Sequence, residues 1–388
     1  MVNTSSSGGG NGGHGPAPDP DEWAEGADQF VDRERLRLAA QRRRRARWRH
    51  DRRHDEASIV SVLRAAVGQR VTVHSASGAT SRGVVVEVGP EVTSVRPGDH
   101  VSSSFMPSCG RCRMCSTGRQ ALCDNGRATF QLGMITDGTS RHRIGDEELL
   151  LFAKLGTFAQ YTCVAESSVI KVEPDIPLEA VAVVSCGVAT GWGSATTRGD
   201  VRPGETVVVV GIGGIGINAV QGARMAGARH VVAVDPIEFK REKAMRLGAT
   251  HAFGSMAEAL PAVNDLTWGR LAETVILTPG VLYGDMLDEA MELAGKDGTV
   301  VVTAIAPLNQ RDVSLNLFKM AMWNKQIKGC LFGGLNPRAD IPRLLDLYRD
   351  GQLKLDELIT QRYSLEDVNQ GYQDLRDGKN VRGVIVHA

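Results

Sequence analysis

The sequence predicts an α/β protein in which a doubly wound parallel sheet is joined to a smaller, β-rich domain. Three observations predict this fold class. The chain has 388 residues, which is too long for one ordinary hydrophobic core. Short apolar runs separated by turn residues follow Gly83, as is typical of a β-rich unit. After Cys186, strand patterns alternate with helix patterns, as they do in parallel α/β sheets.

The composition argues against several classes of protein. Lys plus Arg and Asp plus Glu both number 45, so the net charge is zero and provides no bulk attraction to nucleic acid or membranes. No apolar run approaches the roughly 18 residues needed to span a bilayer. The first twenty residues lack the apolar core of a signal peptide. We therefore expect a cytoplasmic protein without a membrane partner.

Residues 1–82 differ in kind from the rest of the chain. A Gly/Ser-rich tail is followed by an Arg-rich run, with eleven arginines between Arg33 and Arg53 and no lysine before Lys154. Such a segment cannot bury enough apolar surface to order itself, so we predict that it is disordered. Clustered guanidinium groups could instead form an arm that contacts nucleic acid. We do not favour this alternative, because charge runs are more often solvated surface.

The remaining elements follow from their apolar periodicity. The runs GVVVEVGP and GTFAQYTCVAESSVIKV predict strands of the β-rich unit. TVVVV, HVVAV, TVILTPG, GTVVVTAIAP and KQIKGCLFGG predict buried strands of the parallel sheet, with MLDEAMELAG as an intervening helix. ADIPRLLDLYRDGQL and SLEDVNQGYQDLRDGK predict two amphipathic helices before a last strand, VRGVIV, and Ser364 is the expected N-cap of the second helix.

The central part of the chain contains a dinucleotide-binding pattern. A strand at residues 206–210 leads into the turn GIGGIG and then into a helix. The glycines permit a tight turn, close approach of a pyrophosphate and close packing of helix on strand. The expected coenzyme-binding residues of this turn are Gly211, Gly213, Gly214, Ile215 and Gly216.

The next strand ends in Asp235, nineteen residues after Gly216. A carboxylate there can accept from both ribose hydroxyls and repels a 2′-phosphate. The pattern therefore predicts a Rossmann domain that binds NAD rather than NADP. A glycine-rich turn in some other doubly wound protein is the alternative.

A cluster of cysteines predicts a metal site. Cys109, Cys112, Cys115 and Cys123 lie within a Gly/Ser/Arg-rich loop. Four thiolates so close in sequence can form a tetrahedron around Zn²⁺ and leave no open position for substrate, so such a zinc is structural. An iron–sulfur cluster is the rival, because it accepts the same all-cysteine ligands.

The order of these motifs resembles that of a known family. The four-cysteine lobe, SCGVATGWGSA, GIGGIG with Asp235, CLFGG and NVRGVIV together resemble the zinc-containing alcohol dehydrogenases of the medium-chain dehydrogenase/reductase family. PGDHV, GTFAQY and FGGLNPRADIPRLLDLYRDGQL are similar to the actinobacterial NAD-dependent branch, which includes nicotinoproteins assayed with a nitroso dye. The resemblance covers the chain from about Gly83 onward.

The resemblance implies a domain division and a function. Residues 83–187 would form the first part of a GroES-like catalytic domain, 188–330 the Rossmann domain, and 331–388 the rest of the catalytic domain. The implied reaction is hydride transfer between an alcohol or aldehyde and NAD, and the implied assembly is a homodimer or homotetramer. The implied cofactors are NAD and Zn²⁺.

It also implies roles for individual residues. Cys186 would be a ligand of a catalytic zinc, although a lone cysteine is otherwise more often a buried core thiol. The remaining residues would contact the coenzyme: Thr190 and Ile215 the nicotinamide, Phe332 the nicotinamide end through its backbone, Lys240 the adenosine ribose, and Arg382 the pyrophosphate.

The sequence departs from the family at the catalytic zinc. The family's second ligand is the histidine of GHE, and those positions fall on Gly78, Ala79 and Thr80. The family's first ligand is a cysteine of an upstream CxSD-like motif, and this chain has no cysteine before Cys109. His74 is out of register with the histidine of GHE, so Cys186 is the one ligand of three that remains. Two readings stay open. The chain is a non-catalytic NAD-binding homologue with structural zinc only, or residues 1–82 contain out-of-frame translation, because the shifted codons of residues 73–81 can encode P(F/L)x(V/L)GGHE.

Overall fold

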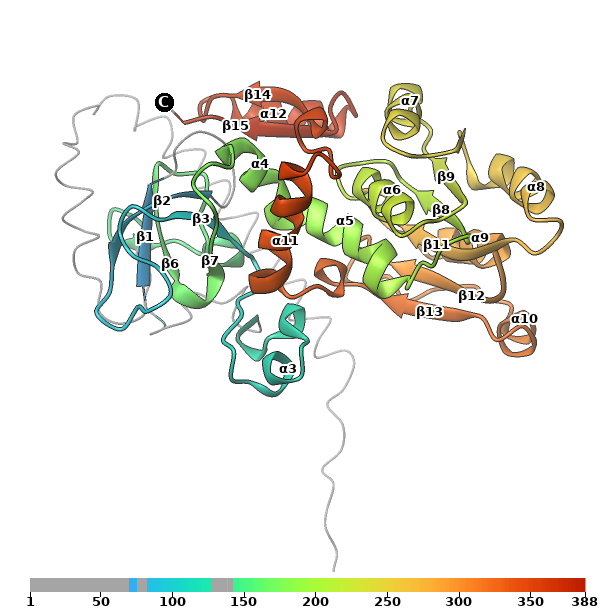
Figure 1. Cartoon of the computed structure of the whole chain (residues 1–388), viewed down its shortest axis with the longest axis horizontal. Coiled ribbons are helices and arrows are strands. Elements are labelled where there is room, and N and C mark those ends of the chain that lie inside the picture. The colour runs from blue at the N-terminus through green and yellow to red at the C-terminus, as the bar shows by residue number, and fades with distance from the viewer. Residues whose placement is uncertain (1–69, 75–81, 127–137, 139–141, 388) are drawn as a thin grey trace, which may run out of the picture. The chain divides into compact units, whose positions relative to one another are not determined.

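The computed structural model of the chain describes residues 70–74, 82–126, 138 and 142–387 (Figure 1). The Gly/Ser-rich tail, the Arg-rich run and the GHE-equivalent positions Gly78 to Thr80 lie outside the described residues.

A six-stranded parallel sheet forms the nucleotide-binding part, with strand order β10-β9-β8-β11-β12-β13. In chain order this is 3-2-1-4-5-6, the order of a Rossmann fold. The predicted doubly wound parallel sheet is therefore confirmed. Its strands are β8 (Thr206–Val210), β9 (His230–Val234), β10 (His251–Phe253), β11 (Ala272–Leu277), β12 (Ala294–Val302) and β13 (Gln326–Gly329).

Helices cover both faces of this sheet because successive strand side chains point to opposite sides. Val207 and Val209 of β8 belong to one apolar core, and Val208 and Val210 belong to another. All are buried, which accounts for the unbroken valine run. The helices of this part are α6 (Gly216–Met225), α7 (Glu238–Arg246), α8 (Met256–Leu266), α9 (Gly284–Leu293) and α10 (Leu317–Met322).

The predicted β-rich unit is a five-stranded antiparallel sheet with order β6-β1-β2-β3-β7. Its strands are β1 (Arg70–His74), β2 (Arg82–Val88), β3 (His100–Ser103), β6 (Tyr161–Ala165) and β7 (Val169–Lys171). The position of β1 corrects our expectation that residues 1–82 are disordered throughout. It pairs with both β2 and β6, so backbone hydrogen bonds on its two edges hold it in the sheet.

One continuous helix connects the two parts of the fold. It runs over Leu178–Arg198 and comprises α4 (Leu178–Val183), a π-helical stretch at Val184–Val188, α5 (Ala189–Gly193) and a second π-helical stretch at Ser194–Arg198. With 21 residues it is long and apolar enough to cross a membrane, contrary to our expectation that no segment approaches that length. However, 83% of its apolar window is buried inside the protein, as in the core helix of a soluble protein.

The last part of the chain contains α11 (Pro337–Arg349), α12 (Val368–Arg376) and the parallel pair β14 (Ile359–Tyr363) and β15 (Arg382–Ile385). The expected N-cap at Ser364 is wrong. The helix begins at Val368, because the Ser364 hydroxyl donates to the Asp367 carboxylate at 2.8 Å rather than capping a helical N–H. The short elements α3 (Arg113–Ser116), β4 (Arg143–Ile144) and β5 (Glu147–Glu148) complete the described α-helices and β-strands, and short 3-10 helices lie at Gln120–Leu122, Phe152–Lys154, Glu166–Ser168, Phe332–Gly334 and Asp356–Leu358.

Candidate coenzyme and metal sites

The glycine turn lies at the carboxyl end of β8, where the strand order reverses. Gly211 has φ of +89°, which favours glycine, and a Cβ on it would lie 2.6 Å from the Pro279 nitrogen. A Cβ on Gly216 would overlap the Gly211 carbonyl oxygen, so only glycine lets α6 start this close to the turn. A Cβ on Gly213, in contrast, would meet no atom within 4 Å, so the outer side of this residue is open to a ligand. This is the arrangement that a diphosphate needs at a helix N-terminus.

Asp235 lies beside this turn and is held in place by backbone donors. Its side chain is buried, Oδ2 accepts from the Ile212 N–H at 2.7 Å, and Oδ1 accepts from the Ile237 N–H at 2.9 Å. A carboxylate has about four acceptor positions, so two remain for hydroxyl donors such as those of a ribose. The turn and Asp235 therefore present a backbone cradle and a fixed carboxylate next to each other.

Arg382 supplies a cation on the other side of the turn. Its guanidinium lies against Gly187 and Gly214, and a Cβ on either glycine would overlap it. Burial lowers the pKa of Arg382, and the nearby Cys186 side chain opposes this shift. The buried Arg382 Nε–H has no hydrogen-bond acceptor within the described part of the chain. A guanidinium beside a glycine turn, with a buried Nε–H that lacks an acceptor, fits an anionic group such as a diphosphate.

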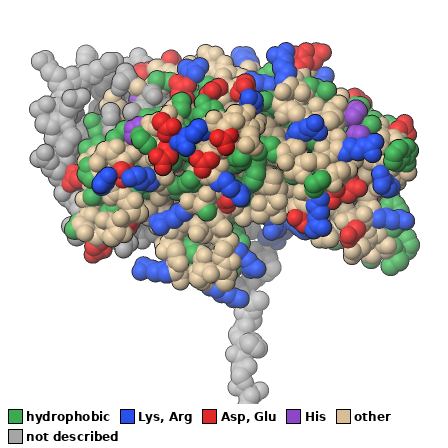
Figure 2. All heavy atoms as spheres, in the orientation of Figure 1, with side chains coloured by type: hydrophobic (Ala, Val, Ile, Leu, Met, Phe, Trp, Pro, Cys, Tyr) green, Lys and Arg blue, Asp and Glu red, His purple; other side chains and the backbone are tan. Residues whose placement is uncertain are grey.

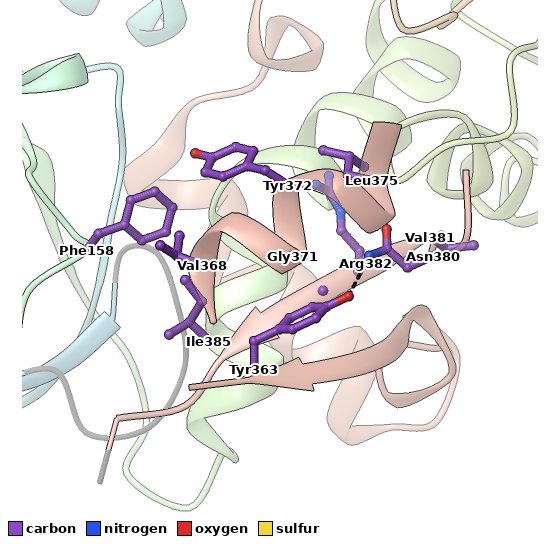
Figure 3. Close-up of a pocket in the computed structure, with 11 residues that line it drawn as sticks. Phe158, Tyr363, Val368, Gly371, Tyr372, Leu375, Asn380, Val381, Arg382 and Ile385 are labelled. Carbon is purple, nitrogen blue, oxygen red and sulfur yellow. Dashed lines mark hydrogen bonds between the residues drawn. The ribbon is translucent and has the colours of Figure 1, made fainter. Parts of the chain in front are cut away.

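Arg382 also lines a pocket of about 220 Å³ between α12 and the β14–β15 pair (Figure 3). Tyr363 and Asn380 lie at the base of this pocket, and the Asn380 amide donates to the Tyr363 hydroxyl at 3.2 Å. The Tyr363 hydroxyl in turn donates to Asp374 at 2.8 Å. This hydrogen-bonded group fixes the start of β15, and with it the backbone from which Arg382 extends.

Cys186 and Thr190 lie one turn apart in the connecting helix. Cys186 is in its first π-helical stretch, a kind of helix irregularity that is frequent at functional sites. Its side chain is exposed, whereas its helix neighbours are buried, so it faces a recess. Desolvation in that recess raises the pKa of Cys186, while Arg382 and a hydrogen bond from Thr190 oppose the shift. The structure thus brings Cys186, Thr190 and Arg382 together.

The other predicted coenzyme residues have different surroundings. Ile215 is half-buried immediately before α6. Phe332 is buried, has φ of +52° and packs edge-on against Phe105 with 5.6 Å between ring centroids. Its side chain therefore belongs to the core, which leaves the backbone as the part able to contact a ligand. Lys240 is half-buried on α7, and its Nζ lies near Gly378.

Sequence reasoning missed Thr278, which fixes the turn. Its hydroxyl donates to the Gly211 carbonyl at 2.7 Å and contacts the Val210 carbonyl at 3.0 Å. Thr278 follows β11, whose carboxyl end is adjacent to that of β8. The signal that could have found it was a polar residue at the end of a buried strand next to the glycine turn.

The four lobe cysteines converge on one point. Their sulfur atoms all lie within 4.8 Å of one another, and the Cys109–Cys115 and Cys112–Cys123 pairs are each 3.9 Å apart. A tetrahedral Zn²⁺ with Zn–S bonds of about 2.3 Å requires sulfurs about 3.8 Å apart. The residues present therefore fit a structural zinc.

Backbone N–H groups also donate hydrogen bonds to the sulfur atoms of this cluster, which favours their ionised form. The Cys112 N–H donates to Cys109 Sγ and the Cys115 N–H donates to Cys112 Sγ, each at 3.4 Å. Hydrogen bonds from the backbone at Asp124 and Cys115 lower the pKa of Cys112 to about 6, whereas burial raises the pKa of Cys115 to about 12. A bound cation would hold such a buried thiol in its ionised form.

A catalytic zinc does not fit the described residues. The four lobe cysteines are the one group of three or more candidate ligands found within residues 70–74, 82–126, 138 and 142–387, and Cys186 is not part of it. The guanidinium of Arg382 is close enough to Cys186 to interact with it electrostatically. We therefore derive no chemical step through a zinc at Cys186.

Comparisons with known proteins agree with this arrangement. The chain matches a family model for the alcohol dehydrogenase GroES-like domain at residues 63–174 and one for zinc-binding dehydrogenases at residues 214–350. The first match begins before Gly83, so the resemblance extends further toward the N-terminus than the sequence motifs indicated.

Among curated proteins, the chain is 53% identical to an NDMA-dependent alcohol dehydrogenase from Amycolatopsis methanolica, over 80% of this chain and 84% of that protein. It is 46% identical to alcohol dehydrogenase B from Mycobacterium tuberculosis, over 79% and 82%. Among solved structures, benzyl alcohol dehydrogenase from Acinetobacter calcoaceticus has a TM-score of 0.73 and 26% identity, over 83% and 93%. The chain belongs to the zinc-containing alcohol dehydrogenases of the medium-chain dehydrogenase/reductase family, oxidoreductases that use NAD and Zn²⁺.

Proposed function

We propose that this chain is an alcohol dehydrogenase with an intact NAD site and an incomplete catalytic zinc site. The reaction of its family is hydride transfer between an alcohol or aldehyde and NAD. One observation carries the coenzyme half of the proposal: the glycine turn, open at Gly213, is hydrogen-bonded to the fixed carboxylate of Asp235 and lies against the Arg382 guanidinium, whose Nε–H has no acceptor among the described residues. These match the ribose and the diphosphate of a dinucleotide.

The roles of the chain's own residues follow from their placement. Asp235 would accept from the adenosine ribose hydroxyls, and its charge disfavours a 2′-phosphate, so NAD is preferred over NADP. Arg382 and the N-terminal N–H groups of α6 would hold the diphosphate. Thr190, Ile215 and the Phe332 backbone would border the nicotinamide, and Lys240 would reach the adenosine ribose.

We expect the structural zinc site to be complete and the catalytic zinc site to be incomplete. Cys109, Cys112, Cys115 and Cys123 would hold one structural zinc, supported by the spacing of their sulfurs. Cys186 would be the remaining ligand of a catalytic zinc, for which the family takes its other two ligands from an upstream cysteine and from the histidine of GHE, at the positions of Gly78 to Thr80. We therefore expect about one zinc per chain, and about two in a chain that carries both the family's GHE histidine and its upstream cysteine ligand.

We also propose a homodimer or homotetramer in the cytoplasm. Ile305, Leu308, Leu317, Phe318 and Met322 are exposed apolar side chains on the segment between β12 and the end of α10. An apolar surface of this kind favours association with a second copy. Sedimentation equilibrium should give a mass of two or four chains, and Phe318→Asp with Leu317→Asp should lower it.

The decisive experiment measures coenzyme binding and turnover separately. We expect the purified 388-residue chain to bind NADH with about one site per chain in a fluorescence titration, and to oxidise primary alcohols far more slowly than the Amycolatopsis relative. Failure to bind NADH would contradict the coenzyme assignment. Turnover similar to that of the relative would contradict the incomplete catalytic site.

A further inference from the structure

A second pocket opens at the amino ends of the strands of the parallel sheet, whereas the glycine turn lies at their carboxyl ends. Its volume is about 390 Å³, and Trp268, Arg270, Glu273 and Lys296 are among its lining residues. Arg270 precedes β11 and Lys296 lies near the start of β12, whereas Gly211 and Asp235 follow the ends of β8 and β9. Because all these strands are parallel, the two sites lie at opposite edges of the sheet. The pocket is within the size range of small-molecule sites.

Trp268 is exposed on a loop that is held rigidly. Its side chain is 75% exposed, although its backbone has φ of +51°, a conformation that is costly for a large residue. Leu271 also has positive φ, at +66°. The buried Thr267 fixes this loop, because its hydroxyl donates to the Val263 carbonyl at 2.7 Å and accepts from the Leu271 N–H at 2.8 Å. The fold thus presents an indole ring to solvent in a defined position.

Two arginines flank this ring, and a third cation, Lys296, lines the same pocket. The guanidinium carbons of Arg229 and Arg270 lie 5.7 and 5.6 Å from the Trp268 ring centroid. Arg229, Arg270 and Lys296 are exposed, and none forms an ion pair with a described residue of the chain. Figure 2 shows basic and histidine side chains gathered on the face over β9 and α8. Exposed guanidinium groups can leave the ring to bind a phosphate.

Glu273 lines the pocket, and its carboxylate must be matched by a hydrogen-bond donor of a ligand rather than by a phosphate. Glu273 Oε2 accepts from the Thr206 N–H at 2.8 Å, which leaves its other oxygen for a further donor. Glu205 lies close enough to Glu273 for their charges to interact, and burial together with this repulsion raises the pKa of Glu205. Inorganic phosphate alone would gain from the cations but would also be repelled by these carboxylates. A ligand with hydroxyl or amine donors beside its phosphate satisfies both groups.

We propose that this pocket binds a nucleoside monophosphate, with its phosphate on Arg270 and Lys296, its base against Trp268, and a hydroxyl or amine donating to Glu273. Stacking of a base on an aromatic side chain is favourable for every base. Arginine and lysine bind phosphate through charge-assisted hydrogen bonds. The site would be additional to the dinucleotide site, because it lies at the other edge of the sheet.

The test uses the full chain saturated with NADH, so that the coenzyme site is occupied, and adenosine monophosphate as the probe in isothermal titration calorimetry. We expect about one adenosine monophosphate per chain, with no change in the fluorescence of bound NADH. Trp268→Ala and Arg270→Ser should each weaken binding roughly tenfold or more. Arg311→Ser is the matched control, because it removes an exposed arginine from the loop after β12, at the opposite edge of the sheet.

Four results would overturn the proposal. The NADH-saturated chain could take up no adenosine monophosphate, or the nucleotide could bind only by displacing NADH. Arg311→Ser could weaken binding as much as Arg270→Ser, which would indicate unspecific attraction. Inorganic phosphate could bind as tightly as the nucleotide, which would mean that the nucleoside half is not recognised. Circular dichroism of each variant checks that the exposed substitutions leave the fold intact.

Discussion

The Arg382 guanidinium occupies the space that a side chain on Gly214 would need, so the last strand of the chain and the glycine turn meet at one point. They are 168 positions apart in the sequence (382 − 214). This relationship joins the C-terminal segment to the coenzyme turn and leads to the first prediction.

Gly214→Ala should weaken NADH binding without unfolding the protein. The new methyl group would meet only the end of a flexible side chain, so Arg382 moves away and its charge-assisted bonds to a diphosphate are lost. Such bonds contribute about 1.5–3 kcal/mol each, which corresponds to a loss of affinity of roughly tenfold or more. Fluorescence titration with NADH measures the loss, and thermal unfolding checks stability.

Two further variants make this test specific. Gly329→Ala in β13 places a methyl group where no atom lies within 4 Å and should leave NADH affinity unchanged. Arg382→Ala should reproduce the loss seen with Gly214→Ala. If Gly214→Ala binds NADH normally while Arg382→Ala does not, displacement of the guanidinium is not the cause.

Asp235→Asn should reduce both coenzyme affinity and stability. An amide cannot accept from the Ile212 and Ile237 N–H groups with both of its terminal atoms, so one donor is left facing an NH₂ group. An unsatisfied buried donor costs about 1–3 kcal/mol. Removal of the charge should also reduce the preference for NADH over NADPH. Parallel titrations with the two coenzymes, with Asp350→Asn at an exposed position as control, measure the change.

Cys112→Ser should release the zinc of the cysteine lobe. Three thiolates and a hydroxyl bind Zn²⁺ more weakly than four thiolates, and the lobe has little apolar core to hold it without the metal. Elemental analysis should fall from about one zinc per chain toward none, with a lower melting temperature. Cys330→Ser is the control, because Cys330 is also half-buried but lies outside the lobe, 3.4 Å from the Ser194 hydroxyl. Equal zinc loss in both variants would argue against the lobe as the binding site.

The nucleotide sequence around codons 73 to 84 should reveal a frame change. We expect one inserted or deleted base whose correction restores GHE at positions 78–80. A chain that regains both the histidine of GHE and the family's upstream cysteine ligand should bind about two zincs and gain alcohol turnover. A gene in which no single-base change restores GHE would reject this explanation and favour the non-catalytic homologue.

The sequence by itself determined the class of the fold and the identity of the coenzyme. Valine runs at a spacing of strand, turn and helix specify a parallel sheet, because both faces of each strand must be covered. GIGGIG followed by Asp235 specifies a dinucleotide turn, because few other residues tolerate that backbone. The cysteine spacing predicts a metal site, and the structure brings the four sulfur atoms within 4.8 Å of one another. Local rules failed at Ser364, whose hydroxyl bonds to Asp367 instead of capping the helix, and at β1, which pairs with the nearby β2 and with β6, a strand distant in sequence.

Only the tertiary structure decided which distant residues share a site. Arg382, Gly214 and Cys186 belong to separate segments, and no periodicity relates them. Thr278 became visible as a support of the turn once β11 was paired with β8. The Trp268 pocket likewise depends on the strand order that places the starts of β11 and β12 side by side. Sequence patterns predict the local structure of one segment. Tertiary packing decides which segments lie next to each other, and a binding site is formed by residues of several such segments.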